Sequence, residues 1–124
     1  DCVFALELVE HLTAPVALLS EIRRVLTDRP DARAIVSVPS PYNWVEVARE
    51  LLGRQDPEGH LVMFTTPVLR NIAALAGLSL DGRWGTSIRI GKSFLSHNSM
   101  LARSRIYRLR KTSEVVFGGR QFHW

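Results

Sequence analysis

The fold is indicated by two consecutive stretches at the start of the chain, Asp1-Cys2-Val3-Phe4-Ala5-Leu6 and Glu7-Leu8-Val9-Glu10-His11-Leu12. The first stretch is mostly apolar and rich in strand formers, which predicts a buried strand of the kind found in parallel sheets. The second places Glu7, Glu10 and His11 at spacing i, i+3, i+4, so a helical turn would project all three side chains from one face. Open α/β sheets bind ligands beyond the carboxyl ends of their strands, and we therefore expect a binding site here.

A helix and a second strand follow this site. Thr13 is a candidate N-cap, and Pro15 suits the first turn of a helix whose apolar residues recur at helical spacing up to Leu26. Residues 34–38, Ala-Ile-Val-Ser-Val, predict a second buried strand. Strand, helix and strand in this order form a βαβ unit, which predicts that the two strands are parallel.

Two more helices are predicted downstream. Residues 45–52 form a short helical segment closed by Gly53. A longer helix is expected to begin with Thr66 as its N-cap and Pro67 at its first position. It should end at Gly77, because glycine readily adopts the left-handed conformation that follows a helix.

The last part of the chain has weaker signals. Strands are predicted near residues 79–84 and 102–109, with a polar loop or hairpin over residues 85–100 between them. We expect one α/β unit over residues 1–111 and a poorly ordered tail over residues 112–124.

Composition limits the class of protein. The 124 residues are 46% hydrophobic, which is ordinary for one small soluble domain. Cys2 is the single cysteine, so the chain forms no internal disulfide and fits a reducing compartment. No apolar run approaches the roughly 20 residues of a membrane span, and no signal peptide is visible. A chain that opens on Asp1, already within a strand, is expected to be a fragment.

The net charge of +4 is concentrated at one end of the chain. Residues 1–102 carry 10 basic and 11 acidic side chains, whereas residues 103–124 carry six basic side chains and Glu114. One interpretation is a contact with phosphate or nucleic acid. The alternative is a solvated edge strand, protected from aggregation by its charges, followed by a loose tail.

Five motifs, in this order and spacing, resemble the C-terminal half of a class I S-adenosylmethionine-dependent methyltransferase of the ubiquinone-biosynthesis O-methyltransferase type. They are Asp1-Cys2-Val3-Phe4-Ala5-Leu6-Glu7-Leu8-Val9-Glu10-His11-Leu12, Glu21-Ile22-Arg23-Arg24-Val25-Leu26, Ile35-Val36-Ser37-Val38-Pro39-Ser40, His60-Leu61-Val62-Met63-Phe64-Thr65, and residues 69–78. The resemblance covers roughly residues 1–110. It implies a partial Rossmann-like sheet comprising strands 4 to 7 of that family, with flanking helices.

Two elements of that family have no counterpart in the chain. These are the glycine-rich loop after strand 1 and the acidic residue that ends strand 2. Gly82-Arg83-Trp84-Gly85 and Gly118-Gly119 do not follow a strand and open a helix, so they do not replace the loop. The resemblance therefore implies that the N-terminal half of the domain lies upstream, and that this fragment is inactive alone.

The resemblance also implies roles for the residues after the first strand. Ala5, Leu6 and Glu7 would lie beside the methionine end and the sulfonium of S-adenosylmethionine. Glu10 and His11 form a candidate catalytic acid/base pair, because a histidine with a near-neutral pKa can accept a proton from a hydroxyl group. Alternatively, these two residues stiffen the loop through local hydrogen bonds.

Other residues are candidates for binding the acceptor or a metal. Tyr42, Asn43 and His60 are assigned to the acceptor site. Glu7, Glu10, His11 and His60 are also similar to the two-Glu, two-His magnesium site of small-RNA 2′-O-methyltransferases, so Mg²⁺ or another divalent ion is a second cofactor to consider. Against this, Mg²⁺ prefers oxygen ligands to imidazole.

The resulting prediction is a cytoplasmic enzyme that methylates a hydroxyl of a small molecule or glycan. A metal-assisted RNA 2′-O-methyltransferase and a non-catalytic, methyltransferase-like interaction module are the alternatives. Neither the acceptor nor the oligomeric state is indicated by these residues.

Overall fold

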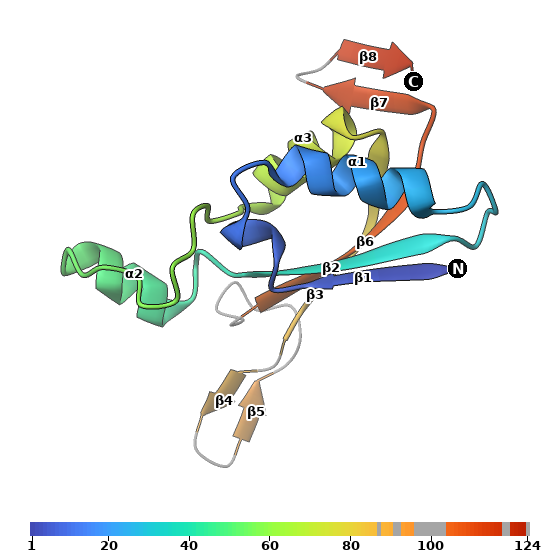
Figure 1. Ribbon diagram of the computed structural model, residues 1–124. Coiled ribbons are helices and arrows are strands. Elements are labelled where there is room, and N and C mark those ends of the chain that lie inside the picture. The colour runs from blue at the N-terminus through green and yellow to red at the C-terminus, as the bar shows by residue number, and fades with distance from the viewer. Residues whose placement is uncertain (87, 91–92, 96–103, 118–119, 124) are drawn as a thin grey trace.

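The computed structural model describes residues 1–86, 88–90, 93–95, 104–117 and 120–123 (Figure 1). Four strands form a mixed sheet in the order β1-β2-β6-β3. Their bounds are Cys2–Leu6 for β1, Arg33–Pro39 for β2, Leu78–Gly85 for β3 and Ser104–Lys111 for β6. β1 and β2 are parallel, which confirms the predicted βαβ unit, and β6 is antiparallel to both β2 and β3.

The helices within the described residues are one short 3-10 turn and three α-helices. Their bounds are Val9–His11 for η1, Pro15–Val25 for α1, Trp44–Leu51 for α2 and Thr66–Leu75 for α3. Figure 1 shows α1 and α3 on the same face of the sheet, whereas α2 lies beyond the carboxyl ends of β1 and β2. None of the helices in the described ranges is long and apolar enough to cross a membrane.

Two predicted helix caps are wrong by one residue. The N-cap of α1 is Ala14, which offers no side-chain oxygen, so Thr13 does not cap this helix. The N-cap of α3 is Thr65, whose hydroxyl accepts a hydrogen bond from the backbone N–H of Val68 at 3.4 Å. Thr66 is instead the first helical residue, and its hydroxyl is available for contacts with the sheet.

Gly77 confirms the predicted end of the third helix. Its φ is +70°, the left-handed region that suits glycine, and it follows the C-cap Ala76. A Cβ at this position would lie 2.5 Å from Nε of Arg23 on α1, and that Nε donates to the Gly77 carbonyl at 3.3 Å. The glycine therefore permits both the turn and the close approach of α1 and the end of α3.

The remaining strands form two small antiparallel pairs. β4 (Ile88–Ile90) pairs with β5 (Ser93–Leu95), in agreement with a hairpin within residues 85–100. β7 (Glu114–Phe117) pairs with β8 (Arg120–His123), where the sequence predicts a poorly ordered tail. Residues 102–103 of the predicted last strand of the main sheet lie outside the described residues.

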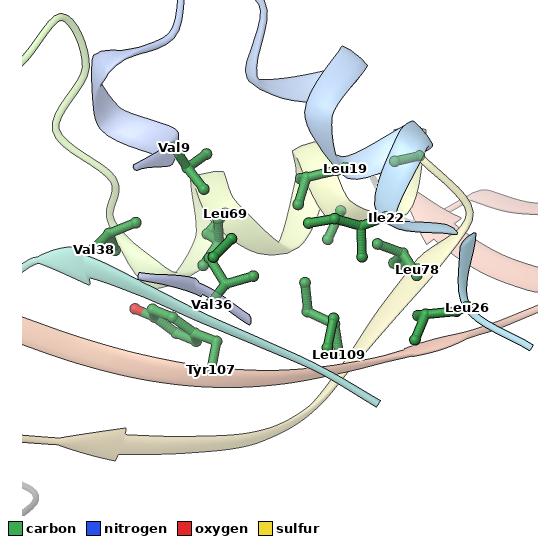
Figure 2. Close-up of a cluster of buried hydrophobic side chains, with 14 of the residues drawn as sticks. Val9, Leu19, Ile22, Leu26, Val36, Val38, Leu69, Leu78, Tyr107 and Leu109 are labelled. Atoms are coloured by element: carbon green, nitrogen blue, oxygen red, sulfur yellow. The ribbon is translucent and has the colours of Figure 1, made fainter. Parts of the chain in front are cut away.

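The hydrophobic core lies between the sheet and the two helices on its covered face (Figure 2). Its largest fully buried side chains are Val9, Leu19, Val36, Val38, Phe64, Leu69, Leu78, Tyr107 and Leu109. Burying a side chain of this size contributes about 1.5–3 kcal/mol, so this layer is a large source of stability.

The opposite face of the sheet is covered by none of the described helices (Figure 1). On β1, Phe4 is 65% and Leu6 56% exposed, while Ala5 between them is 4% exposed. The prediction that this strand is buried is therefore wrong for one of its faces. Successive side chains of a strand point to opposite faces, and only one face here is packed against helices.

Charged residues on strands β2, β3 and β6 are paired with one another. Asp81 lies where the β3–β6 register shifts, and its carboxylate is 2.8 Å from Arg108, 3.6 Å from Arg33 and 4.0 Å from Arg110. We call these four residues the Asp81 network. Because β6 lies between β2 and β3, the interpretation of the basic segment as an edge strand is wrong.

Candidate functional site

The carboxyl ends of β1 and β2 meet at one edge of the sheet, where Glu7 leaves β1. Glu7 has a φ of +48°, which is uncommon for a residue with a side chain. Its backbone N–H donates to the carbonyl oxygen of Ser37 at 3.1 Å and lies 3.0 Å from the Ser37 hydroxyl. These contacts hold Glu7 in a left-handed conformation, whereas the spacing of Glu7, Glu10 and His11 predicts a helical turn that includes all three.

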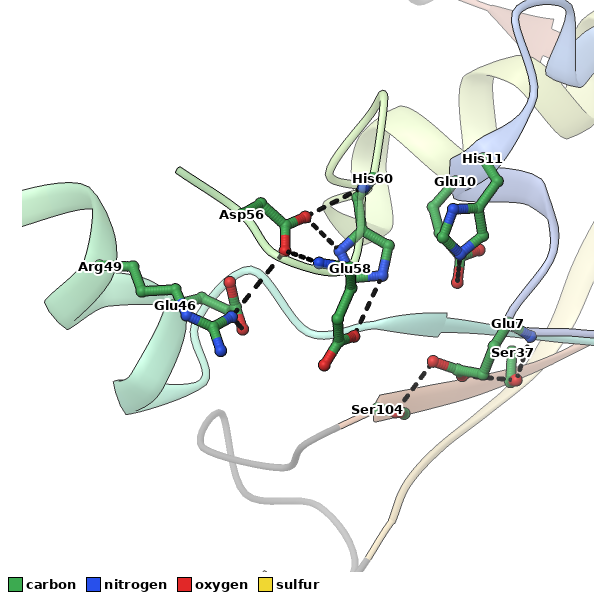
Figure 3. Close-up of polar contacts among 10 residues, drawn as sticks. All are labelled: Glu7, Glu10, His11, Ser37, Glu46, Arg49, Asp56, Glu58, His60 and Ser104. Atoms are coloured by element: carbon green, nitrogen blue, oxygen red, sulfur yellow. Dashed lines mark hydrogen bonds and ion pairs between the residues drawn. The ribbon is translucent and has the colours of Figure 1, made fainter. Parts of the chain in front are cut away.

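The Glu7 carboxylate is held by two hydroxyl groups (Figure 3). Ser37 donates to Oε1 at 2.7 Å, and Ser104 on β6 donates to Oε2 at 3.3 Å. Glu7 thus links three strands at the edge of the sheet. The sequence offered no signal for either serine.

Glu10 lies in η1, and its environment is the opposite of that of Glu7. It is 0% exposed, and none of the described residues donates a hydrogen bond to either oxygen of its carboxylate. Burial raises the pKa of Glu10 above its usual value, and the negative charge of Glu7 adds to this rise. A buried carboxylate without a donor is unfavourable, so its position needs an explanation beyond packing.

Two imidazoles lie next to Glu10. The backbone carbonyl of Glu10 accepts hydrogen bonds from the N–H groups of Leu61 and Val62 at 2.8 and 3.2 Å, which brings His60 to η1. The rings of His11 and His60 have centroids 4.9 Å apart, and Nε2 of His11 is 4.0 Å from Oε1 of Glu10. We call Glu10, His11 and His60 the Glu10 cluster. One potential ligand atom from each lies within 4.8 Å of the others.

His60 is positioned by a polar loop (Figure 3). Its side chain is 4% exposed, and its Nδ1 lies 2.6 Å from Oδ2 of Asp56. Asp56 also accepts hydrogen bonds from the backbone N–H groups of Glu58 and His60 at 2.9 and 3.0 Å, and these bonds lower the pKa of Asp56. Oε2 of Glu58 is 3.4 Å from Nε2 of His60. Neither acid was predicted from the sequence as a site residue, although Asp56 precedes His60 by four residues in a turn-rich segment.

A cavity of about 520 Å³ adjoins this loop. It is lined by Pro41, Tyr42, Glu46, Val47, Arg49, Glu50, Leu51, Arg54, Asp56, His60 and Met63. Two of the three predicted acceptor residues, Tyr42 and His60, therefore share one cavity. The third, Asn43, is the N-cap of α2, where its side-chain oxygen accepts a hydrogen bond from Val45 at 3.1 Å.

Three of the four residues predicted to bind a metal are brought together in the Glu10 cluster. Glu7 lies outside this group, since its carboxylate is bound by Ser37 and Ser104. Of the residues predicted beside the cofactor, Ala5 packs its side chain into the core, whereas Leu6 and Glu7 are exposed beyond it.

No protein-family model matches the sequence. No curated protein matches it either. Among solved structures, the chain is similar to magnesium protoporphyrin IX methyltransferase (ChlM) from Synechocystis PCC 6803, solved with bound SAH. The two share 19% sequence identity with a TM-score of 0.57, and the match covers 90% of this chain but 45% of that chain. The chain therefore shares the fold of part of that protein, and it spans less than half the length of that structure.

Proposed function

We propose that this chain is the C-terminal half of an S-adenosylmethionine-dependent methyltransferase that acts on a hydroxyl of a small molecule or glycan. The observation that carries the proposal is the Glu10 cluster, which lies next to a cavity at the carboxyl edge of β1 and β2. This edge is where open α/β sheets bind their ligands. The methyltransferase fold supports the reaction class, and the single, exposed Cys2 fits a reducing, cytoplasmic setting.

The residues at the end of β1 fit the methionine end of the cofactor. S-Adenosylmethionine supplies a methyl group on a positively charged sulfonium. Glu7 offers an exposed carboxylate at the strand end, and Leu6, 56% exposed, offers apolar surface beside it. A negative charge held in place by Ser37 and Ser104 suits a positively charged ligand.

His11 is the residue best placed to accept the proton of the acceptor hydroxyl. Its side chain is 38% exposed, so an acceptor can reach the ring, and Glu10 lies behind it at 4.0 Å. Glu10 in its ionised form would stabilise the imidazolium that results. Tyr42 and His60 line the cavity in which the acceptor would be oriented.

The test is His11→Ala in the full-length protein that contains this chain. We expect kcat to fall by roughly 10²–10⁴-fold, the usual span for general acid–base catalysis, with the Kd for SAH unchanged. The limb of the pH–rate profile that reports the general base should also disappear. Thr13→Ala is the matched control, because Thr13 is exposed in the same loop and does not cap α1.

Several outcomes would contradict this assignment. An unchanged kcat would remove His11 from the catalytic residues. A joint fall in SAH affinity and melting temperature, with an unchanged pH profile, would instead assign His11 to holding the loop. Failure of the full-length protein to bind SAH would favour the non-catalytic interaction module.

The unpartnered Glu10 carboxylate supports a second candidate, a metal-assisted enzyme such as an RNA 2′-O-methyltransferase. One carboxylate and two imidazoles within 4.8 Å fit a divalent ion, and Asp56 would orient His60. This donor set suits a first-row transition ion better than Mg²⁺, which prefers oxygen ligands. The ion would acidify and position the acceptor hydroxyl.

Titration with Co²⁺, followed by calorimetry and visible absorption, tests this candidate without an activity assay. We expect one ion per chain in the wild type and loss of binding in His60→Ala, with Glu7→Gln as the control that retains binding. An absence of Co²⁺ and Mn²⁺ binding by the wild type would reject the metal-assisted candidate and leave the acid/base role of His11.

A further inference from the structure

Arg105 is a buried cation that the roles assigned above do not use. It lies on β6, opposite Val38 of β2 and Gly85 of β3, near the same carboxyl edge of the sheet. It is 7% exposed, and it lies on the same, covered face of β6 as Tyr107 and Leu109. Arginine is rarely buried to this extent unless its charge is paired.

The contacts of Arg105 include no carboxylate within the described part of the chain. Its Nη1 donates to the hydroxyl of Thr66 at 3.1 Å, and its guanidinium carbon lies 5.2 Å from the ring centroid of Tyr42. Both partners are neutral. By contrast, Arg33 and the other arginines of the Asp81 network share a carboxylate. A buried charge without a counter-ion is strongly unfavourable.

A second guanidinium converges on the same hydroxyl. Nη1 of Arg83 on β3 lies 3.5 Å from Oγ1 of Thr66, which is also 2.9 Å from the hydroxyl of Tyr107. Arg83 likewise has no acidic partner among the described residues. Two like charges are thus directed at one neutral oxygen, an arrangement that an anion between them would stabilise.

The N-terminus of α3 adds positive potential of the same sign. α3 begins at Thr66, and its first turn contains no acidic residue. Helix N-termini favour anions and disfavour neighbouring cations. Two guanidinium groups and the Tyr107 hydroxyl therefore meet at the Thr66 hydroxyl, at the N-terminus of α3, and none of the described residues pairs a carboxylate with either guanidinium.

We propose that Arg105 and Arg83 bind an oxyanion, carboxylate or phosphate, carried by the methyl acceptor. Tyr42 connects this anion site to the acceptor cavity, because it contacts Arg105 and also lines the cavity next to His60. The acceptor is then an anionic molecule whose hydroxyl lies near the Glu10 cluster. The identity of the anion's carrier rests on the proposed function, whereas the anion site itself does not.

The first experiment uses the full-length protein that contains this chain and inorganic phosphate, with acetate as the carboxylate probe and chloride at matched ionic strength as the reference. Phosphate or acetate should raise the melting temperature of the wild type above its value in chloride, because a ligand that binds the native state stabilises it. Arg83→Gln should weaken binding of the effective anion about tenfold, equivalent to about 1.4 kcal/mol. Whichever probe is effective distinguishes phosphate from carboxylate.

The variants are chosen so that misfolding does not obscure the result. Arg83 is exposed, so Arg83→Gln should fold, and Arg105→Gln should abolish the anion effect if it folds. Arg70→Gln is the matched control, since Arg70 is an exposed arginine further along α3. Equal melting temperatures in all three anions, or wild-type anion affinity in Arg83→Gln, would overturn the anion site.

A second measurement separates this inference from the proposed function. In the full-length protein, Arg83→Gln should raise the KM for an anionic acceptor about tenfold and leave kcat and the Kd for SAH unchanged. Anion binding without SAH binding would refute the methyltransferase proposal and leave the anion site standing. SAH binding with no anion effect would refute the anion site alone.

Discussion

The carboxylates of the Asp81 network and the Glu10 cluster differ in their exposure to solvent and in their partners. The Asp81 side chain is 19% exposed and lies within 4.0 Å of three arginines. Glu10 is fully buried, has two histidines beside it, and receives no hydrogen bond from the described residues. Asp81 therefore contributes to stability through its partners, whereas no partner among the described residues offsets the burial of Glu10.

The difference between the two regions follows from their positions in the fold. The Asp81 network spans three neighbouring strands, where side chains from adjacent strands meet and remain partly hydrated. Glu10 is carried by a 3-10 turn that packs against the loop containing His60. Pairing at a partly hydrated surface requires little desolvation, but burial of a lone carboxylate does.

The largest stability effect is expected for Asp81→Ala. Removing the carboxylate leaves Arg33, Arg108 and Arg110 without their shared partner, and we expect a loss of about 2 kcal/mol in the free energy of unfolding. Urea denaturation measures this change. Asp31→Ala is the control, because Asp31 is exposed and pairs only locally with Arg29. Equal losses in the two variants would remove the distinction between the network and an ordinary surface pair.

Glu10→Met should have a smaller effect of opposite sign. The substitution replaces an unpartnered carboxylate by an apolar chain of similar length, so the free energy of unfolding should rise by about 1 kcal/mol. Glu7→Met should instead destabilise the chain, because it removes the hydrogen bonds from Ser37 and Ser104. A loss of stability in Glu10→Met would show that Glu10 has a partner in solution.

The pH dependence of stability sharpens the same contrast. The pKa of Glu10 is raised on folding, so the folded chain holds this proton more tightly than the unfolded chain does. Stability should therefore fall as the pH rises from the ordinary pKa of 4.5 through the raised value. Subtracting the urea stability curve of Glu10→Gln from that of the wild type isolates this contribution. A difference that grows with pH would contradict the burial of Glu10.

The smallest effect is expected for Asp28→Asn. The hydrogen bond from Lys111 at 2.8 Å, with the charge of that lysine, lowers the pKa of Asp28. Its contribution is present above the ordinary pKa and is lost as the pH falls through the lowered value. Because Asp28 is exposed, solvent should reduce this contribution below that of Asp81. A loss in urea stability equal to that of Asp81→Ala would show that exposure does not separate these pairs.

Much of the fold could be read from local patterns. The parallel pair of strands, the helix between them and the Gly77 helix end were all predicted, because apolar periodicity and backbone preferences act over a few residues. The errors at Thr13 and Thr66 are single-residue shifts, because sequence patterns locate a helix end only to within one or two residues. The exposed face of β1 was missed, because an apolar strand does not show how many layers cover it.

For the candidate site, too, some features could be predicted from the sequence and others could not. The sequence by itself determined that Glu7, Glu10 and His11 follow a strand at a ligand-binding edge, and the family resemblance added His60 as a candidate site residue. Only the tertiary structure decided that Glu7 is bound by hydroxyl groups, that Glu10 is buried with no donor among the described residues, and that His60 reaches His11. Likewise, only the tertiary structure shows that Arg105 and Arg83 both contact the hydroxyl of Thr66. The physical reason is that desolvation and pairing depend on neighbours distant in the sequence, whereas periodicity reports only on neighbours along the chain.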